Sequence, residues 1–392
     1  MVWDRLKTYM STHFLSTPLT KSEESGHIRR RPRCRCSNQM SRLLLPLLVT
    51  LGTASAAADG GGAIAAGASS AGLHFLAMGD WGGQDAAPYT QPGQAKAAVA
   101  MATVAAQINA SFALGMGDNF YGAGIHGDEH DARFAETFEN VYTGSSLDIP
   151  FYMIAGNHDH KGNVTAQIAY SADSTRWNYP TPYYAIGPVN FTTSSGKAAS
   201  FQMFMIDTVV WSGNSDDFDA HDPAGHRGNG RRSKFDALPG TAPGHAGLAD
   251  AQTAWLKAQL AASTATHLWV GGHYPVYSAG SHGPTANLIL ELLPLLKEHG
   301  AHYVCGHDHM LEHISHAGVE HILTGAGDNC CYKQEASLLL PLGSLKFITS
   351  DKAKSAIEGG FVSFSLDDET TVTYYDQDGK VIYTTPGIAP RA

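Results

Sequence analysis

Five short apolar segments of the sequence each lead into a glycine that is followed by Asp, Asn or His. The segments span residues 73–78, 111–116, 151–154, 268–270 and 303–305, and the polar residues after them are Asp80, Asp118, Asn157-His158, His273 and His307-Asp308-His309. One such residue after a glycine usually marks only a turn. Five of them, each behind a predicted strand, are expected to converge if the strands share one sheet edge. The pattern therefore predicts a ligand site.

The residue types at these turns indicate a pair of metal ions. The candidate ligands are Asp80, Asp118, Tyr121, Asn157, His273, His307 and His309. Seven ligands are too many for one tetrahedral zinc ion, whereas two adjacent ions bridged by Asp118 would use them all. Asp80 and the phenolate of Tyr121 are hard oxygen donors that suit Fe³⁺. Asn157 and the imidazoles suit Fe²⁺, Zn²⁺ or Mn²⁺.

Two neighbouring metal ions favour a displacement reaction at phosphorus. They can clamp the attacking and leaving oxygens, and they lower the pKa of bound water so that a metal-bound hydroxide attacks at mild or acidic pH. No Ser or Cys nucleophile is then required. His158 can protonate the departing alkoxide as general acid. The alternative for the candidate ligands and His158 is a structural role in a turn, a helix cap or packing. Asp159, His160 and Asp308 have no predicted chemical role, and we expect them to serve turn geometry and hydrogen bonding.

These motifs resemble those of the metallophosphoesterase superfamily, whose signature is GD, GDN, GNHD or GNHE, and GHxH in this order. The chain is more closely similar to the purple acid phosphatases, specifically to the small tartrate-resistant (type 5) group. The matching motifs are Gly79-Asp-Trp-Gly-Gly83, Gly117-Asp-Asn-Phe-Tyr121, Gly156-Asn-His-Asp-His160, Gly272-His-Tyr-Pro-Val276, His282-Gly-Pro-Thr285 and Gly306-His-Asp-His309. The resemblance extends over residues 72–386, almost the whole chain after the leader.

The resemblance implies how the ligands divide between the two ions and which fold positions them. An Fe³⁺ site would use Asp80, Asp118, Tyr121 and His309, and a divalent site would use Asp118, Asn157, His273 and His307. The bond from the Tyr121 phenolate to Fe³⁺ gives the family its purple colour. His158 and His282 stand where the family has catalytic histidines near the substrate. The family fold is of the α+β class, a four-layer α/β/β/α sandwich in which helices flank two mixed β-sheets.

The composition is that of an acidic globular protein. The chain has 392 residues, of which 43% are hydrophobic and 16% charged, and its formal net charge is −10. The hydrophobic content excludes a disordered chain, and the negative charge argues against nucleic acid as a main partner. We expect a monomer that acts on a small phosphate ester or a phosphoprotein. Bound metal ions would supply the local positive charge that such an anionic substrate requires.

The first seventy residues indicate export rather than a folded domain. An apolar run at residues 43–51, too short to span a bilayer comfortably, precedes Ala54-Ser55-Ala56, the small-residue pattern of a signal-peptidase site. We predict three regions: a leader with a secretory signal over 1–56, a flexible linker over 57–71 and a catalytic domain over 72–388. The signal peptide lies around 40–56, and translation starts at either Met1 or Met40.

Sequons at Asn109, Asn163 and Asn190 support secretion and predict a glycoprotein. The protein is then expected outside the cell or in the lumen of the secretory pathway, lysosome or vacuole. No stable membrane insertion is expected once the signal is cleaved. An uncleaved anchor is the alternative.

From Gly72 onward the sequence alternates predicted strands and helices. Helices are predicted at residues 94–109, 131–141, 250–262 and 287–298, the last kinked or split by Pro294, and further strands at 200–206, 321–324 and within 360–385, with a hairpin turn at 376–379. Residues 213–246 predict a long loop, with Arg231-Arg232 as a protease target. The resemblance implies that this loop lies over the active site. Cys305 is expected to be a buried thiol, and a bond between Cys330 and Cys331 to be strained.

Three other functions stand beside the leading hypothesis of an acid phosphatase. A phosphodiesterase of the same fold is the runner-up, and Tyr121 discriminates because generic phosphodiesterases of the superfamily usually lack this tyrosinate and are colourless. A secreted interaction protein with an inactive site would be marked by a lost ligand, and every expected ligand is present. A mixed-valence iron pair could also generate reactive oxygen species as a side activity.

Overall fold

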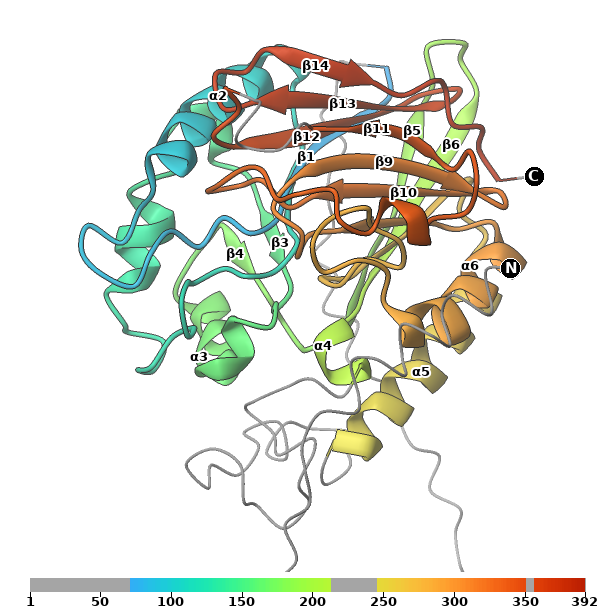
Figure 1. Cartoon of the computed structure of the whole chain (residues 1–392). Coiled ribbons are helices and arrows are strands. Elements are labelled where there is room, and N and C mark those ends of the chain that lie inside the picture. Colours follow the sequence, from blue (N-terminus) through green and yellow to red (C-terminus); the bar gives the residue numbers. More distant parts are fainter. Residues whose placement is uncertain (1–70, 213–244, 350–355, 392) are drawn as a thin grey trace, which may run out of the picture. The chain divides into compact units, whose positions relative to one another are not determined.

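The computed structural model describes residues 71–212, 245–349 and 356–391 (Figure 1). The predicted leader and signal, the linker up to residue 70 and nearly all of the predicted 213–246 loop, including Arg231-Arg232, lie outside the described residues. Within the described part of the chain, no helix is long and apolar enough to cross a membrane. The secretory signal and the protease-sensitive loop therefore stay predictions.

The first of two seven-stranded sheets has the order β14-β13-β12-β1-β2-β3-β4. Its strands are β1 (Leu73–Met78), β2 (Ala113–Gly115), β3 (Phe151–Met153), β4 (Trp177–Asn178), β12 (Gly360–Leu366), β13 (Thr370–Asp376) and β14 (Val381–Thr384). Strands β1 to β4 are parallel, and β12 to β14 continue the sheet in antiparallel fashion from β1. The parallel half brings the carboxyl ends of three predicted strands to one edge.

The second sheet has the order β11-β9-β10-β8-β7-β6-β5. Its strands are β5 (Tyr184–Thr192), β6 (Ala198–Met205), β7 (His267–Gly271), β8 (His302–Cys305), β9 (Leu311–His316), β10 (Val319–Thr324) and β11 (Leu345–Ile348). Strands β6, β7, β8 and β10 are parallel, and the outer strands pair antiparallel. This sheet therefore has its own parallel centre, from which the remaining predicted ligands emerge.

An aromatic layer joins the two sheets. Phe75 of β1 lies 5.1 Å from the ring centroid of Phe201 on β6, and Trp269 of β7 contacts Phe364 of β12 edge-on at 5.2 Å. All four side chains are almost completely buried. Strands that are covered on both faces are apolar along most of their length, which explains why these strands could be recognised as apolar runs.

Helices cover the outer faces of the sandwich. Helix α2 (Pro92–Ile108) buries Ala97, Met101 and Val104 and contacts β1 and β12. On the second sheet, α5 (His245–Ala262) and α6 (Leu293–His299) form an apolar cluster with strands β7 and β8. The shorter helices are Phe134–Glu139, Ser145–Leu147, Asp159–Lys161, α3 (Val164–Ala169), Tyr170–Ala172, α4 (Thr208–Trp211), Leu288–Leu292 and Ser337–Leu339. This arrangement confirms the predicted four-layer sandwich of two mixed sheets flanked by helices.

Some local predictions need correction. The strands that precede the candidate ligands do not share one sheet edge, because three belong to the first sheet and two to the second. The predicted helix at 131–141 is a single π-helical segment, Phe134–Glu139. The predicted helix at 287–298 is present without a break, since the π-helical segment Leu288–Leu292 passes directly into α6, which begins at Leu293 with Pro294 in its first turn. Cys305 is a buried free thiol, and the neighbours Cys330 and Cys331 form a disulfide.

One buried histidine makes the stability of this fold sensitive to acid. His321 of β10 is buried, and neither of its ring nitrogens has a hydrogen-bond partner among the described residues. Burial lowers its pKa from the ordinary 6.5 to about 3. The unfolded chain takes up a proton near pH 6.5, whereas the folded chain does not. This residue therefore contributes stability above pH 6.5 that is lost as the pH falls from 6.5 toward 3.

Replacing His321 by Leu is expected to flatten the acid side of the stability profile. Between about pH 7.5 and about pH 5, the free energy of unfolding of the wild type should fall by about 2 kcal/mol more than that of His321→Leu, because about 1.5 pH units lie below the unfolded pKa. Urea unfolding at both pH values measures this difference, and the exposed His126→Leu is the control. An equal pH dependence in wild type and His321→Leu would contradict the prediction.

Candidate metal centre

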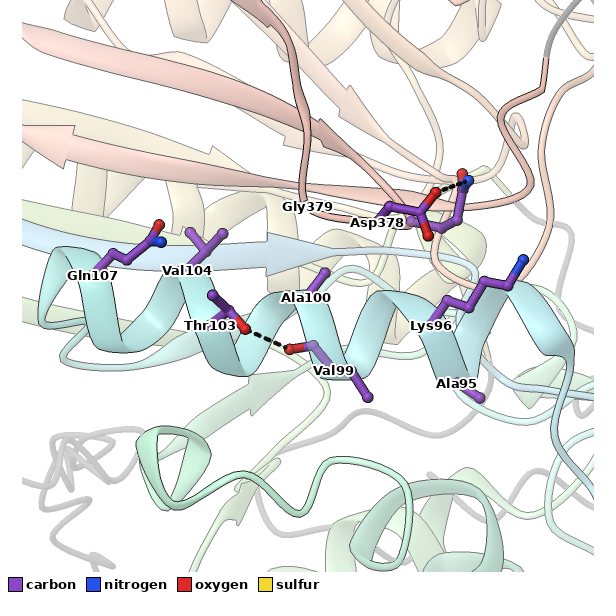
Figure 2. Close-up of a pocket in the computed structure, with 10 residues that line it drawn as sticks. Ala95, Lys96, Val99, Ala100, Thr103, Val104, Gln107, Asp378 and Gly379 are labelled. Carbon is purple, nitrogen blue, oxygen red and sulfur yellow. Dashed lines mark hydrogen bonds between the residues drawn. The ribbon is translucent and has the colours of Figure 1, made fainter.

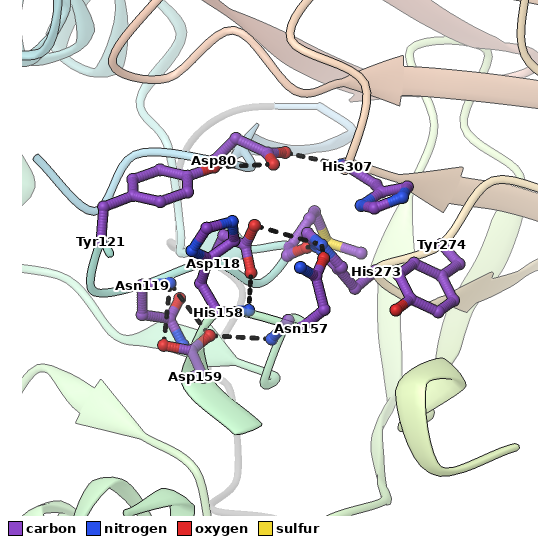
Figure 3. Close-up of polar contacts among 12 residues, drawn as sticks. Asp80, Asp118, Asn119, Tyr121, Asn157, His158, Asp159, His273, Tyr274 and His307 are labelled. Atoms are coloured by element: carbon purple, nitrogen blue, oxygen red, sulfur yellow. Dashed lines mark hydrogen bonds and ion pairs between the residues drawn. The ribbon is translucent and has the colours of Figure 1, made fainter. Parts of the chain in front are cut away.

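The structure brings the seven candidate ligands together at the carboxyl ends of strands from both sheets, and Figure 3 labels all of them except His309. Asp80 follows β1, Asp118 and Tyr121 follow β2, Asn157 follows β3, His273 follows β7, and His307 and His309 follow β8. Backbone hydrogen bonds join the strand ends. The amide of Asp80 donates to Gly117 O at 2.9 Å, and the amide of Gly306 donates to His273 O at 3.0 Å. The predicted convergence is therefore present, although the strands come from two sheets.

Three of the candidate ligands have left-handed backbone conformations. The φ angles are 57° at Asp80, 52° at Asp118 and 76° at His307. Residues other than glycine rarely adopt this conformation, and it costs about 1–3 kcal/mol where it occurs. The conformation turns the chain sharply at the strand end. Strain of this kind at three converging residues is typical of a functional site.

The glycines that precede the ligands leave room for ligand side chains from other strands. A Cβ atom on Gly306 would lie 2.3 Å from Oδ2 of Asp80, and one on Gly156 would lie 2.2 Å from Oδ1 of Asp118. Both distances are far below a normal van der Waals contact. The repeated glycine in the sequence pattern therefore serves close packing of neighbouring loops as well as chain reversal.

Replacing Gly306 by Ala is expected to push Asp80 out of place. The overpacking should cost about 1–3 kcal/mol of stability. We expect a loss of phosphate-ester hydrolysis on the order of 100-fold, because a displacement of about 1 Å has effects of this size. Gly343→Ala is the control for activity, since a Cβ there meets nothing within 4 Å and the φ of 75° adds backbone strain alone. Activity and metal content measured on both variants decide the point, and a fully active Gly306→Ala protein would contradict the packing argument.

Asp80, Tyr121 and His309 form the first of two groups of donor atoms. The Tyr121 hydroxyl donates to Oδ1 of Asp80 at 3.0 Å and lies 2.8 Å from Nε2 of His309. Nε2 of His309 is 3.6 Å from Oδ1 of Asp80. Two hard oxygen donors and one imidazole nitrogen thus face one another. Nδ1 of His309 is buried and has no hydrogen-bond partner among the described residues.

Asp118, Asn157 and His273 form the second group. Nε2 of His273 lies 3.1 Å from Oδ1 of Asn157 and 3.5 Å from Oδ2 of Asp118. The other ring nitrogen, Nδ1, lies 2.9 Å from the carbonyl oxygen of Met116, which fixes the orientation of the imidazole. The His307 ring is next to His273, with 5.1 Å between ring centroids. Ligand atoms of Asp80, Asp118 and His273 all lie within 4.8 Å of one another, so the two groups adjoin.

The two histidines predicted to be catalytic contact different candidate ligands. The backbone amide of His158 donates to Oδ1 of Asp118 at 2.8 Å, its Nδ1 contacts the carbonyl oxygen of Gly122, and its ring meets that of Tyr121 edge-on at 4.6 Å. His282 stacks on His307 with 4.1 Å between ring centroids. His158 therefore contacts candidate ligands of both groups, and His282 contacts His307.

The site buries two carboxylates that have no permanently charged side chain beside them among the described residues. Asp80 and Asp118 are almost fully buried, and no Lys or Arg of the described residues pairs with either. Burial raises the pKa of Asp80 well above its ordinary value. Burial also acts to raise the pKa of Asp118, but the charge of His273 outweighs it and lowers this pKa. Metal ions would supply the missing positive charge.

Two of the histidines are in the state that metal binding requires, whereas His273 and Tyr121 would have to release a proton. Burial acts to lower the pKa of His273, but the charge of Asp118 outweighs it and raises this pKa to about 10. Burial lowers the pKa of His309 to about 4 and that of His307 well below its ordinary value, so both are neutral and able to coordinate. Burial and the charge of Asp80 raise the pKa of Tyr121 well above 10. Its phenolate would therefore form only with a strong cation nearby. The donor set thus fits a metal centre.

Asp159 holds the two central loops of the site together, a role that the sequence did not reveal. Its carboxylate accepts hydrogen bonds from the backbone amides of Asn119 and Phe120 at 3.0–3.2 Å, from the amide of Gly156 at 2.8 Å and from Nε2 of Gln167 at 2.9 Å. These donors belong to the loops after β2 and β3 and to α3. The only signal was the acidic residue that ends the GNHD motif.

A hollow of about 470 Å³ lies away from the metal centre, between α2 and the β13–β14 hairpin (Figure 2). Its lining includes Val99, Ala100 and Thr103 of the helix and Asp378 and Gly379 of the hairpin turn. None of the candidate ligands lines it. The chemistry of the sequence motifs is therefore confined to the centre at the strand ends.

Comparison with known proteins agrees with this centre. The family model described as calcineurin-like phosphoesterase matches residues 73–311, which include all seven candidate ligands. The chain belongs to the calcineurin-like phosphoesterase family. Tartrate-resistant acid phosphatase type 5 from Sus scrofa is 41% identical over 317 residues, which are 80% of this chain and 86% of the relative. The same enzyme from Homo sapiens is 40% identical over 319 residues, 80% of this chain and 90% of the relative.

More distant relatives of this phosphoesterase agree. Purple acid phosphatase 17 from Arabidopsis thaliana is 28% identical over 318 residues, 79% of this chain and 83% of the relative. The solved structure of GAP50, the anchor in the inner membrane complex of Plasmodium, has the same fold, with a TM-score of 0.65, 24% identity and coverage of 82% of this chain and 90% of that chain. The predicted family and the predicted enzyme class, acid phosphatase, are thereby confirmed.

Proposed function

We propose that this phosphoesterase hydrolyses phosphate monoesters at a dinuclear centre of Fe³⁺ and a divalent ion, which is Fe²⁺, Zn²⁺ or Mn²⁺. The observation that carries the proposal is the contact of the Tyr121 hydroxyl with both Asp80 and His309. A phenol among carboxylate and imidazole ligands is a hard donor that favours Fe³⁺ over a divalent ion. The type 5 acid phosphatases among the relatives support the substrate class.

The residues divide as the two groups of contacts suggest. Fe³⁺ would be held by Asp80, Asp118, Tyr121 and His309, and the divalent ion by Asp118, Asn157, His273 and His307. When bound, the two ions would attract the phosphate and supply a water molecule of lowered pKa as the nucleophile. Asp118 lies between the groups, and the backbone amide of His158 holds its carboxylate in place.

The catalytic histidines would act on the substrate itself. Because Nδ1 of His158 contacts the carbonyl oxygen of Gly122, Nε2 is the atom that would carry the proton and give it to the leaving oxygen. His282, on the side of His307, would contact a phosphate oxygen.

The biological setting follows from the leader and the sequons. We propose that residues 72–388 form the catalytic domain of a monomer that is exported by the signal at 40–56. Asn109 and Asn190 are exposed and therefore accessible to glycosylation, which supports this proposal. The substrate would be a small phosphate ester or a phosphoprotein outside the cytosol.

A comparison of ester types tests the proposed activity. The purified protein should hydrolyse 4-nitrophenyl phosphate at about pH 5 with a kcat/KM at least about tenfold above that for bis(4-nitrophenyl) phosphate. A preference for the diester would instead support the phosphodiesterase alternative. A protein that binds two metal ions and hydrolyses neither ester would overturn the assignment as a phosphatase.

A further inference from the structure

A short loop, residues 278–282, carries His282 to the metal centre; residues 278–280 are buried, whereas Ser281 and His282 are exposed. It connects the segment after β7, which holds the candidate ligand His273, with the helices that precede β8. Ser278 at its start is completely buried. Two acidic side chains from the segment after β8, Asp308 and Glu312, are also buried and face this loop. The loop therefore packs on polar groups rather than on an apolar surface.

Asp308 holds both ends of the loop with one carboxylate. Its Oδ1 accepts a hydrogen bond from the backbone amide of His282 at 3.0 Å, and its Oδ2 accepts one from the Ser278 hydroxyl at 2.6 Å. The Ser278 oxygen in turn accepts the backbone amide of Gly280 at 2.9 Å. Three polar groups of the loop are thus bonded, directly or through Ser278, to a residue that stands between His307 and His309.

The fit between loop and carboxylate is close. A Cβ atom on Gly280 would lie 2.4 Å from Cγ of Asp308, so only glycine permits this approach. Oε1 of Glu312 accepts the backbone amide of Ala279 at 3.0 Å, and the carbonyl oxygen of Ala279 accepts the amide of Ala336 at 3.0 Å. The loop therefore has little freedom to shift while Asp308 stays in place.

The side chain of His282 rests on the same segment. Its ring stacks on that of His307, with 4.1 Å between centroids and 27° between planes. It also meets Tyr332 edge-on at 5.6 Å, and Tyr332 stacks on His309 at 4.5 Å and 6°. His282 thus contacts one candidate ligand directly and the other through Tyr332.

We propose that Asp308 is a positioning residue, which acts through Ser278 and the backbone amide of His282 to hold the His282 imidazole against the substrate phosphate. The inference rests on the proposed function, which gives His282 a phosphate oxygen to contact. Because Asp308 lies between two candidate ligands, one segment would position both the metal ions and this histidine. The relative placement of ions and imidazole would then be set by a few buried hydrogen bonds.

A double-mutant cycle between Ser278→Ala and His282→Ala tests the proposal. Ser278→Ala changes no candidate ligand and should keep the wild-type metal content. We expect it to lower kcat/KM for 4-nitrophenyl phosphate, and the affinity for inorganic phosphate, by about tenfold in the wild type and by less than about twofold in the His282→Ala background. Ser363→Ala is the matched control. Ser363 of β12 is also buried, but its hydroxyl forms a hydrogen bond with the Tyr375 hydroxyl of β13 and not with a residue of the 278–282 loop.

Two variants of Asp308 provide an independent measurement. Asp308→Asn keeps an oxygen that can accept the His282 amide, whereas Asp308→Ala does not. Phosphate affinity and kcat/KM should therefore fall further in Asp308→Ala than in Asp308→Asn. Equal losses in the two would show that the carboxylate charge matters and not the hydrogen bond, which would overturn the proposal.

The outcomes separate this inference from the proposed function. If the losses from Ser278→Ala and His282→Ala multiply in the double variant, the loop does not act through His282 and the inference is wrong while the phosphatase stands. If the wild type binds phosphate and hydrolyses no ester, the proposed function fails, and the phosphate affinities still decide the role of Asp308. A wild-type protein that neither binds phosphate nor hydrolyses an ester would overturn both the proposed function and the role of Asp308.

Discussion

Replacing Asp118 by Ala is expected to abolish the dinuclear centre and to reduce phosphatase activity by at least about a thousandfold, the upper range for loss of one group that stabilises transition-state charge. A ligand atom of Asp118 lies within 4.8 Å of ligand atoms of both Asp80 and His273, one from each group of donors. Its Oδ2 lies 3.5 Å from Nε2 of His273, and its Oδ1 accepts the backbone amide of His158 at 2.8 Å. Loss of this side chain would remove the proposed shared ligand and the acceptor of the His158 amide.

Metal analysis and steady-state kinetics on the same preparation measure this effect. Asp128→Ala is the matched control, because Asp128 is an exposed aspartate that accepts the backbone amide of His130 and contacts none of the candidate ligands. The variant Asp118→Ala should bind fewer than two ions per chain, and Asp128→Ala should equal the wild type. Two tightly bound ions in Asp118→Ala would contradict the bridging role.

Replacing Asp159 by Ala is expected to cost about 3–5 kcal/mol of stability, because it leaves several buried donors without their acceptor. The amides of Asn119, Phe120 and Gly156 and the side-chain amide of Gln167 all donate to this carboxylate. Asp159 is completely buried, so water cannot easily replace it. Because these donors belong to the loops that carry Asp118 and Asn157, metal affinity should fall as well.

Urea unfolding of the metal-free protein isolates the effect of Asp159→Ala on stability from its effect on metal binding. Asp376→Ala is the matched control. Asp376 also accepts two backbone amides, those of Asp378 and Lys380, but in an exposed hairpin turn where water can take its place. We expect the control to cost less than about 1 kcal/mol. A similar loss in both variants would mean that Asp159 is an ordinary turn residue.

The candidate ligands could be predicted because their signal is local. Each follows an apolar strand and a glycine, and both features can be read within a few residues of sequence. Glycine is required at these positions for two reasons. It permits the turn, and at Gly156 and Gly306 its lack of a Cβ leaves room for a ligand side chain from another loop. The resemblance to purple acid phosphatases added the division of ligands between two ions, which residue types alone left open.

The assignment of strands to sheets could not be predicted in the same way, because strand pairing depends on residues far apart in the chain. Strand β5 escaped recognition since Gly187-Pro188 interrupts it, and the structure shows a shift of register between Ile186 and Val189 at this point. Strand β9 escaped because its polar residues Glu312 and His313 are buried like apolar ones.

The supporting contacts of the site were hidden for a related reason. Asp159 and Asp308 were expected to serve turn geometry and hydrogen bonding, and hydrogen bonding is what they do. Their partners, however, lie in other loops. Asp159 reaches Asn119 of the preceding motif, and Asp308 reaches Ser278 and His282. A single sequence contains the motifs but not the distances between them.

The visible absorption spectrum of the purified protein, with metal analysis of the same sample, tests the central claim most directly. We predict a broad band that makes the protein purple, two metal ions per chain including iron, and loss of this band in Tyr121→Phe with iron still bound. A colourless wild type with two metal ions and no iron would contradict the Tyr121–Fe³⁺ assignment. A wild type that cannot be loaded with any metal would contradict the metal centre altogether.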